Sequence, residues 1–247
     1  MDDEKVPTIP SEPCWIESIQ AVKDSTRFQS YEEFRAHLIR TLPQNSLATR
    51  KRYSSYILKR FFPNGSLRQL SAAVWHAYQD ETLLEQVMRY SFLSHEPLIG
   101  GFVGDVLFQL SPGSQIPRAL LEDYIFRIYG ETKEKAVKRL AGSLRALGFI
   151  ARRKNKWIVQ GINKPELALL IVTHHLFALT PAVITLRQIL SNPYWKYVGL
   201  TDEGSVKGVL RVAAAKGMIA KYVVADDIEQ ITTRYSLEEF LERRRRL

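Results

Sequence analysis

The stretch TKEKAVKRLAGSLRALGFIARRKNKWIV, residues 132–159, decides how this sequence is expected to fold. Its first half repeats apolar residues at three- and four-residue spacing, which predicts an amphipathic helix that ends at Leu147. Gly148 then acts as a helix C-terminal cap. Two short runs on either side of Lys154-Asn155 predict a β-hairpin. The stripe expected to face the core consists of Val137, Leu140, Ala141, Leu144 and Leu147.

A further helix, expected from Pro117 to about Tyr129, precedes this stretch. Helix, turn, amphipathic helix, glycine stop and basic hairpin is the order of a winged helix-turn-helix. Its second helix enters the major groove of DNA while the hairpin lies along the backbone. The candidate DNA-binding residues of the helix are Lys135, Lys138, Arg139 and Arg145. Those of the hairpin are Arg152, Arg153, Lys154 and Lys156, and an earlier basic helix, residues 46–62, adds Arg50, Lys51 and Arg52. We expect Trp157 to pack against the helices rather than to stack on bases.

The positive charge of the chain is concentrated in this same stretch. The 247 residues include 35 Lys and Arg against 26 Asp and Glu, a net charge of +9. Residues 131–164 hold ten bases and two acids, a net +8, whereas residues 1–33 hold three bases and eight acids, a net −5. A concentrated surplus indicates a polyanionic partner such as nucleic acid, although a charge run is more often a solvated face.

The helix, the glycine stop and the strand recur 69 residues later. VKRLAGSLRALGFIAR (137–152) aligns without gaps to VKGVLRVAAAKGMIAK (206–221), with six of sixteen positions identical. Such a fixed offset predicts two copies of one supersecondary unit, with chance similarity of two amphipathic helices as the alternative. Residues 201–235 hold five bases and five acids, and Asp226-Asp227 stands at the tip of the second hairpin. Because phosphate repels an acidic tip, the first copy is the one expected to bind DNA.

The expected fold class is mainly α, with a helical N-terminal region followed by two winged-helix-like units that carry short β-hairpins. The expected domains are an acidic, Pro-containing and disordered lead (1–29), a helical domain (30–112), a basic winged-helix-like unit (113–164) and a second such unit with a C-terminal helix (165–247). Leu167 to Leu186 is uncharged and long enough to span a bilayer. His174-His175 and Pro181 favour two buried core helices instead, so no membrane partner is expected.

Residues with the spacing of a catalytic or metal site are not found in the sequence. Gly100, Gly101 and Gly104 are not followed by the Lys-Ser/Thr of a P-loop. The adjacent His174 and His175 point to different helix faces and cannot form an i, i+4 metal pair. The lone Cys14 excludes a disulfide framework and a Cys-rich zinc finger, and it is typical of a reducing, cytoplasmic compartment. We therefore expect a non-enzymatic protein with no metal, no cofactor and no small-molecule substrate.

Three segments of the sequence, in this order, carry a resemblance to a known family: NSLATRKRYSSYILKRFF (45–62), SHEPLIGGFVGDVLFQL (94–110) and LRALGFI (144–150). In these segments the chain resembles the BrxA family of bacteriophage-exclusion (BREX) phage-defence systems, over roughly residues 30–160. The resemblance implies a small bacterial, mostly helical, non-enzymatic protein that binds double-stranded DNA. It would act beside a larger defence complex that methylates host DNA and blocks phage replication. The acidic lead and the region after residue 160 depart from the pattern, so the chain resembles a divergent member with an extended C-terminal region.

The leading hypothesis is binding of double-stranded DNA, mainly through phosphate and mainly without sequence specificity. The expected helix face is rich in Lys and Arg but has no Asn or Gln, the side chains that read adenine. Two alternatives remain open. One is a protein–protein assembly component of a phage-defence complex, which the neutral second copy favours. The other is a winged-helix transcription regulator, which predicts a dimer on a palindromic site. RNA binding is weaker, because no stacking-aromatic motif is present.

Overall fold

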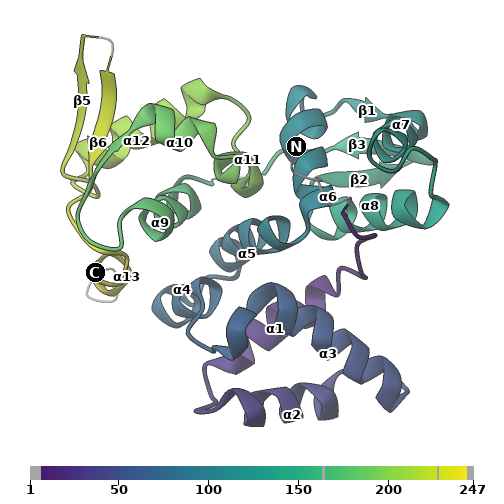
Figure 1. The fold of residues 1–247 in the computed structure, drawn as a ribbon. Coiled ribbons are helices and arrows are strands. Elements are labelled where there is room, and N and C mark those ends of the chain that lie inside the picture. Colours follow the sequence, from purple (N-terminus) through teal and green to yellow (C-terminus); the bar gives the residue numbers. More distant parts are fainter. Residues whose placement is uncertain (1–6, 163–164, 227, 244–247) are drawn as a thin grey trace, which may run out of the picture. The chain divides into compact units, whose positions relative to one another are not determined.

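The computed structural model describes residues 7–162, 165–226 and 228–243. The chain is mainly helical and carries two small three-stranded antiparallel sheets (Figure 1), which agrees with the fold class at this coarse level. Its residues group into two compact units, each drawn from two stretches of sequence. The first unit combines Met1–Leu67 with Ser91–Ile162, and the second combines Arg68–Tyr90 with Asn163–Leu247.

The N-terminal part of the first unit is built from three helices. They are α1 (Trp15–Ser25), α2 (Tyr31–Thr41) and α3 (Leu47–Phe61), followed by a 3-10 turn (Pro63–Gly65). The side chains of Ser30 and Ser46 cap α2 and α3 by accepting backbone N–H groups at 3.2 and 3.1 Å. The ring of Phe34 packs against that of Phe62 at a centroid distance of 4.7 Å and closes the core between α2 and α3.

The expectation of a disordered lead does not hold for residues 15–25, which form α1. Its Trp15 is buried, and the indole lies 6.4 Å from the ring of Phe61 and 6.2 Å from that of Phe92. Val22, two turns later, is fully buried. Acidic residues and prolines suggested disorder, but the apolar residues at helical spacing supply enough buried surface to order the segment.

The remainder of the first unit contains one of the two sheets. Its elements are the end of α5 (Glu81–His95), α6 (Pro97–Gly101), a π turn (Phe102–Val106), a 3-10 turn (Leu107–Gln109), β1 (Gln115–Ile116), α7 (Arg118–Tyr129), α8 (Glu134–Ala146), β2 (Ile150–Arg153) and β3 (Lys156–Val159). The strand order is β1-β3-β2, with α8 below the sheet in Figure 1. The apolar stripe predicted for α8 is buried at all five positions. The hairpin and its Lys154-Asn155 turn are also confirmed.

The second unit has a similar order of elements, with two short helices where the first unit has α7 and with one more helix at its end. It consists of α4 (Leu70–Tyr78), the start of α5, α9 (Glu166–Phe177), β4 (Val183–Thr185), α10 (Leu186–Ser191), α11 (Tyr194–Val198), α12 (Glu203–Ala215), β5 (Lys221–Ala225), β6 (Ile228–Thr232) and α13 (Leu237–Arg243). The strand order is β4-β6-β5, which matches β1-β3-β2 strand for strand. The ring of His174 on α9 stacks on that of Phe240 on α13 at 4.3 Å.

The two copies agree in detail at their glycine stops. Helices α8 and α12 begin and end 69 residues apart, and Gly148 and Gly217 adopt φ angles of 79° and 69°. The next residue in each copy donates its N–H to a carbonyl five residues back, Phe149 to Leu144 at 3.0 Å and Met218 to Ala213 at 2.9 Å. These bonds define the same Schellman cap, which requires a left-handed residue at the glycine. The repeat predicted from the sequence is therefore a repeat of structure.

The uncharged run after residue 166 differs from the expectation of two buried core helices. After α9, the residues around Pro181 form a loop and then strand β4, so only the first half of Leu167–Leu186 is a core helix. No helix in the described part of the chain is long and apolar enough to cross a membrane.

The expected domain boundaries at residues 29, 112 and 164, which divide the sequence into consecutive segments, stay a prediction. The compact grouping differs from it, because α4 packs with α13 and so belongs with the C-terminal residues.

Candidate nucleic-acid interface

Three of the four predicted bases of α8 lie on one exposed row of the helix. Lys135, Lys138 and Arg145 are exposed, and Gly142 stands in the same row between the last two. The spacing of three, seven and ten residues from Lys135 keeps these positions on one side of a helix with 3.6 residues per turn. A Cβ added at Gly142 would meet no atom within 4 Å. The row therefore carries positive side chains at both ends and no side chain at Gly142, between Lys138 and Arg145.

The four predicted bases of the hairpin are all exposed, but they face two sides of the sheet. Arg153 is paired with Lys156 in the strand register, and Arg152 with Trp157. Because Ile116 is buried and also pairs with Trp157, the Arg152 row is the inner face of the sheet. The guanidinium of Arg152 lies 5.9 Å from the half-buried Trp157 ring and donates to Oδ1 of Asn155 at 2.9 Å.

The turn between these strands is a two-residue type with positive φ at both positions. Lys154 has φ 46° and Asn155 has φ 64°. Asn tolerates this left-handed conformation well, whereas a lysine side chain there is strained. The turn therefore presents the Lys154 side chain at the tip of the hairpin, beside Arg153 and Lys156.

One acid moderates the charge at the start of α8. Glu134 forms ion pairs with Lys138 at 3.3 Å and with Arg118 of α7 at 2.5 Å. The hydrogen bond from Lys138 and that from Arg118 lower the pKa of the Glu134 carboxyl below its ordinary value. These exposed pairs orient the side chains more than they stabilise the fold. Lys138 is consequently a partly neutralised member of the row.

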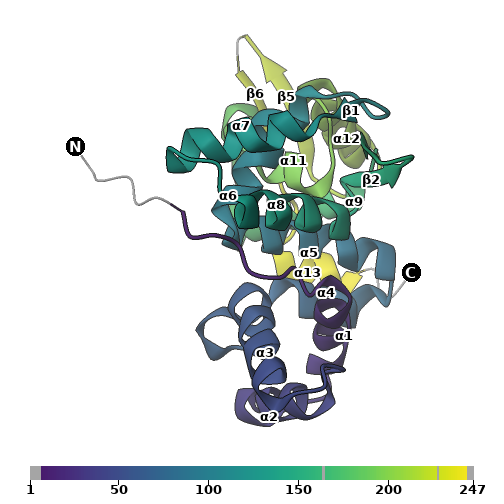
Figure 2. The same cartoon turned by 90° about the vertical axis from the view of Figure 1, so that its right-hand side faces the viewer.

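Arg139 differs from the other predicted bases of α8 because its guanidinium is paired with a distant acid. The carboxylate of Glu12, in the segment before α1, forms an ion pair with it, and the Arg139 side chain is only 27% exposed. Figure 2 shows this segment, in purple, passing beneath α8 on its way to α1. Glu12 thus neutralises Arg139, one of the four candidate DNA-binding residues of α8.

The three consecutive bases of α3 do not form one patch. Successive residues of an α-helix are separated by about 100°, so Arg50, Lys51 and Arg52 point in three directions. Lys51 lines a groove shared with α2, and Arg52 lies 6.0 Å from the ring of Tyr53. Nε of Arg50 is buried and has no hydrogen-bond partner among the described residues. The structure therefore separates residues that are adjacent in the sequence.

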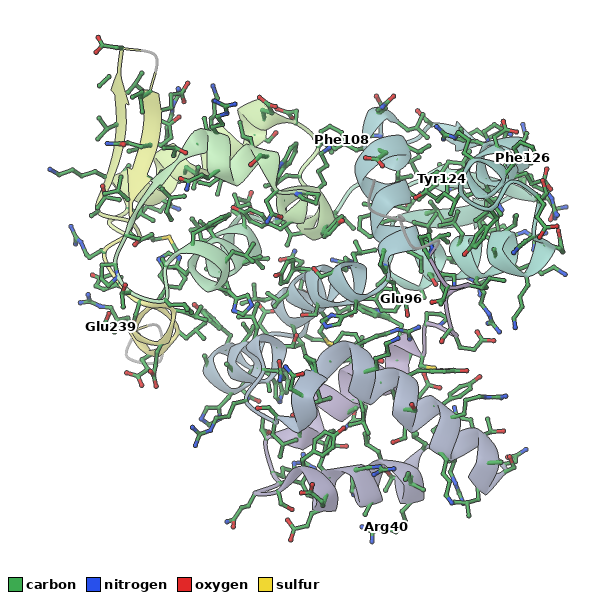
Figure 3. All side chains as sticks on the ribbon, in the orientation of Figure 1. Arg40, Glu96, Phe108, Tyr124, Phe126 and Glu239 are labelled. Atoms are coloured by element: carbon green, nitrogen blue, oxygen red, sulfur yellow. The ribbon has the colours of Figure 1, made fainter. Side chains whose placement is uncertain are left out.

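The most buried cation of the first unit's described residues, Arg60, has no local signal in the sequence. Its side chain is 2% exposed, and its Nε donates to Oε1 of Glu96 at 2.7 Å. Nη1 donates to the carbonyls of Glu12 and Pro13 at 2.6 and 3.1 Å. The guanidinium also lies 4.6 Å from the Phe92 ring. Figure 3 labels Glu96 where α6 begins. Arg60 is a structural residue, and only its partners far along the chain reveal that.

The second copy uses its bases differently. Lys207 of α12 forms an ion pair with Glu229 of β6 at 2.8 Å, and the hydroxyl of Tyr222 donates to the same carboxylate. The hydrogen bonds from Lys207 and Tyr222 lower the pKa of the Glu229 carboxyl. Arg211 lies over the Tyr222 ring at 5.3 Å. Asp226 is exposed beside the second turn, while Asp227 lies outside the described residues. Lys207 and Arg211 of α12 therefore contact side chains of the neighbouring strands β5 and β6.

The described residues contain no group of three or more His, Cys, Asp or Glu placed to hold a metal ion. Cys14, at the start of α1, is buried, and burial raises the pKa of its thiol to about 12. When the chain is compared with known proteins, no family model, no curated protein and no solved structure matches it. Indications of function therefore come from the residues and their geometry.

Proposed function

We propose that the chain binds double-stranded DNA through α8 and the β2–β3 hairpin, which together act as a winged helix-turn-helix. The order β1, α7, α8, β2, β3, with β3 in the centre of the sheet, supports this assignment. In such a module the second helix enters the major groove and the hairpin follows the backbone. The helix in question is α8, whose exposed row carries Lys135, Lys138 and Arg145.

The observation that carries the proposal is the register pair Arg153–Lys156. Like charges directly opposite each other on neighbouring strands destabilise a sheet, and the strained Lys154 adds a third charge beside them. In the described ranges no acidic side chain forms an ion pair with any of these three residues. A phosphate backbone lying along the hairpin offsets the repulsion.

The exposed row of α8 favours contacts to phosphate over readout of bases. Its side chains are Lys and Arg, and α8 contains no Asn or Gln to read adenine. Gly142 lets the helix approach a surface closely, because nothing projects from the middle of the row. Binding in this mode is mainly non-specific and strongly dependent on salt.

The biological setting we propose is bacterial phage defence, as a cytoplasmic accessory protein without catalytic activity. The resemblance of residues 45–62, 94–110 and 144–150 to the BrxA family supports this setting. The neighbouring genes test it: a DNA methyltransferase and a large ATPase beside this gene would favour phage defence. An isolated gene would favour a transcription regulator.

Protein–protein assembly is a second candidate, and the second copy favours it. Five of its apolar side chains are more than half exposed: Leu179, Val183, Val212, Val224 and Ile228. Lys207 of α12 is paired with Glu229, and Asp226 is exposed beside the turn, so the hairpin tip of this copy repels phosphate. A defence complex assembled around the chain would use this copy for protein contact and the first copy for DNA.

A salt-dependent titration of duplex DNA tests the main proposal. Wild-type protein is titrated into a labelled duplex at several salt concentrations, next to a variant with Arg153, Lys154 and Lys156 changed to Glu. The matched control changes Lys216, Lys221 and Arg234 of the second unit to Glu, which alters the net charge equally. The hairpin variant should bind more weakly and reduce the salt slope by about one for each phosphate that it no longer neutralises, and the control should not. Equal effects in both variants, or a salt-independent affinity, would refute the proposal.

A further inference from the structure

A groove of about 700 Å³ lies between α2 and α3 in the first unit. The side of α3 that faces it, continued by Phe62 just after the helix, carries Lys51, Ser54, Ser55, Leu58 and Lys59. These positions follow one another at three- and four-residue spacing, so they form a single stripe of the helix. Tyr31, Arg35 and Ile39 of α2 form the opposite wall at a spacing of four residues. The volume is within the range of small-molecule sites in proteins.

The charge of this groove is entirely positive. Arg35, Lys51 and Lys59 line it, each exposed, and none of its lining residues is Asp or Glu. His95, at the end of α5, also lines it and bonds the carbonyl of Ser91 through Nδ1 at 2.8 Å. The Nδ1–H tautomer is therefore fixed, and Nε2 is the ring nitrogen left to meet a ligand. Three cations that share one concave surface without an acid favour an anionic ligand.

A buried polar atom in the same groove points independently to a ligand. The hydroxyl of Ser54 has no hydrogen-bond partner in the described part of the chain, although the residue is only 1% exposed. Buried polar groups are usually paired, so an orphaned hydroxyl that lines a groove is a place where water or a group from outside the chain can complete the bonding. A hydroxyl can donate to an oxyanion, so its chemistry matches that of the three cations.

We infer that the α2–α3 groove binds a phosphate group, with Arg35, Lys51 and Lys59 pairing with its charge and Ser54 donating a hydrogen bond to one oxygen. The apolar walls, Tyr31, Ile39 and Phe62, accommodate the body of the molecule that carries the phosphate. That molecule is either DNA, whose backbone would extend the α8 surface, or a free phosphorylated compound. The site stands on its own observations and does not need the hairpin to bind DNA.

The test is calorimetric titration of the full chain with inorganic phosphate and with AMP at constant ionic strength, followed by titration of a duplex. The main variant is Arg35→Gln with Lys59→Gln. The matched control is Arg40→Gln with Arg27→Gln, which removes two exposed positive charges near the same helix but outside the groove. Figure 3 labels Arg40 on α2. Phosphate or AMP affinity should fall roughly tenfold or more in the groove variant and remain unchanged in the control.

A second variant, Ser54→Ala, separates a binding role from a structural one. Removing an unpaired buried hydroxyl should leave the unfolding temperature of the ligand-free protein unchanged or higher, while phosphate affinity falls. If phosphate and AMP do not bind but the groove variant alone weakens duplex binding, the site is assigned to the DNA backbone. The inference is overturned if neither anion binds and both double variants weaken duplex binding equally. It is also overturned if the anions bind with the same affinity to wild type, Ser54→Ala and the groove variant.

Discussion

Lys138 and Lys207 occupy the same position of the repeat, yet their side chains are 72% and 32% exposed. Nζ of Lys138 lies 3.3 Å from Glu134, one turn earlier on the same helix. Nζ of Lys207 instead reaches the neighbouring sheet and lies 2.8 Å from Glu229. One lysine remains available to an external anion, and the other joins a helix to a strand. The same backbone unit therefore supports two uses of one residue.

Replacing each lysine by methionine should separate these uses. Lys207→Met should lower the unfolding temperature, because Glu229 then loses the partner that lowers its pKa most and keeps only the weaker effect of Tyr222 and Arg211. A carboxyl with a lowered pKa stabilises the fold above its ordinary pKa and ceases to do so as the pH falls through its folded value. The variant should therefore be destabilised less by acidification than the wild type. Lys138→Met should lower the unfolding temperature less, because its ion pair with Glu134 is more exposed to solvent, and it should reduce the salt slope of duplex binding by about one. The reverse pattern would contradict the division of roles.

Glu12→Gln should strengthen duplex binding by releasing Arg139 from its ion pair. A freed guanidinium beside the candidate row can neutralise one more phosphate, so affinity should rise severalfold and the salt slope should steepen by about one. Glu32→Gln is the control, because this exposed acid on α2 contributes the same charge. Equal increases in both variants would mean that only net charge matters and that the N-terminal segment does not restrain α8.

Glycines of the repeat should respond to alanine in opposite ways. Gly148 and Gly217 have φ angles of 79° and 69°, so alanine at either position should cost about 1–2 kcal/mol of unfolding free energy. Gly142 is within α8 and a Cβ there meets nothing, so Gly142→Ala should stabilise by about 0.5–1 kcal/mol. Chemical denaturation of the three variants checks this. Stabilisation by Gly148→Ala would show that the glycine stop is not the cap we describe.

His174 should make the second unit sensitive to mild acid. Burial lowers the pKa of its imidazole, which is stacked on Phe240. In the unfolded chain the imidazole takes up a proton near pH 6.5, whereas in the folded chain it does so only at lower pH. The free energy of unfolding is therefore at its full value above pH 6.5. It should decline as the pH falls from there towards the folded pKa. His174→Phe should flatten this dependence in urea titrations between pH 7.5 and 5. A pH-independent wild type would rule out this role.

Local features of the fold could be predicted from the sequence, and features that depend on distant partners could not. The α8 stripe, the Lys154-Asn155 turn and the serine caps follow from periodicity and turn chemistry within a few residues. The two-residue strand β1 carries too little pattern to be recognised without its partner β3. Strand β4 lies within an uncharged run whose composition is equally typical of a buried helix.

The candidate site divides in the same way. The exposure of Lys135, Lys138 and Arg145 follows from the helical period once the buried stripe is known. The pairing of Arg139 with Glu12 joins residues more than a hundred positions apart, and no local signal reports it. The same holds for Arg60, which stands among the bases of the 46–62 helix in the sequence although it is 2% exposed.

Arg60 also constrains the order in which the first unit can be completed during synthesis. Its guanidinium donates to the carbonyls of residues 12 and 13 and to the carboxylate of Glu96. The contacts that hold the start of α1 in place are therefore incomplete in a nascent chain until residue 96 has left the ribosome. Until then the rings of Trp15 and Phe61 lack Phe92, and a buried guanidinium lacks its counterion. Chains stalled before that point should be aggregation-prone clients of chaperones, while chains a few dozen residues longer can fold around the arginine.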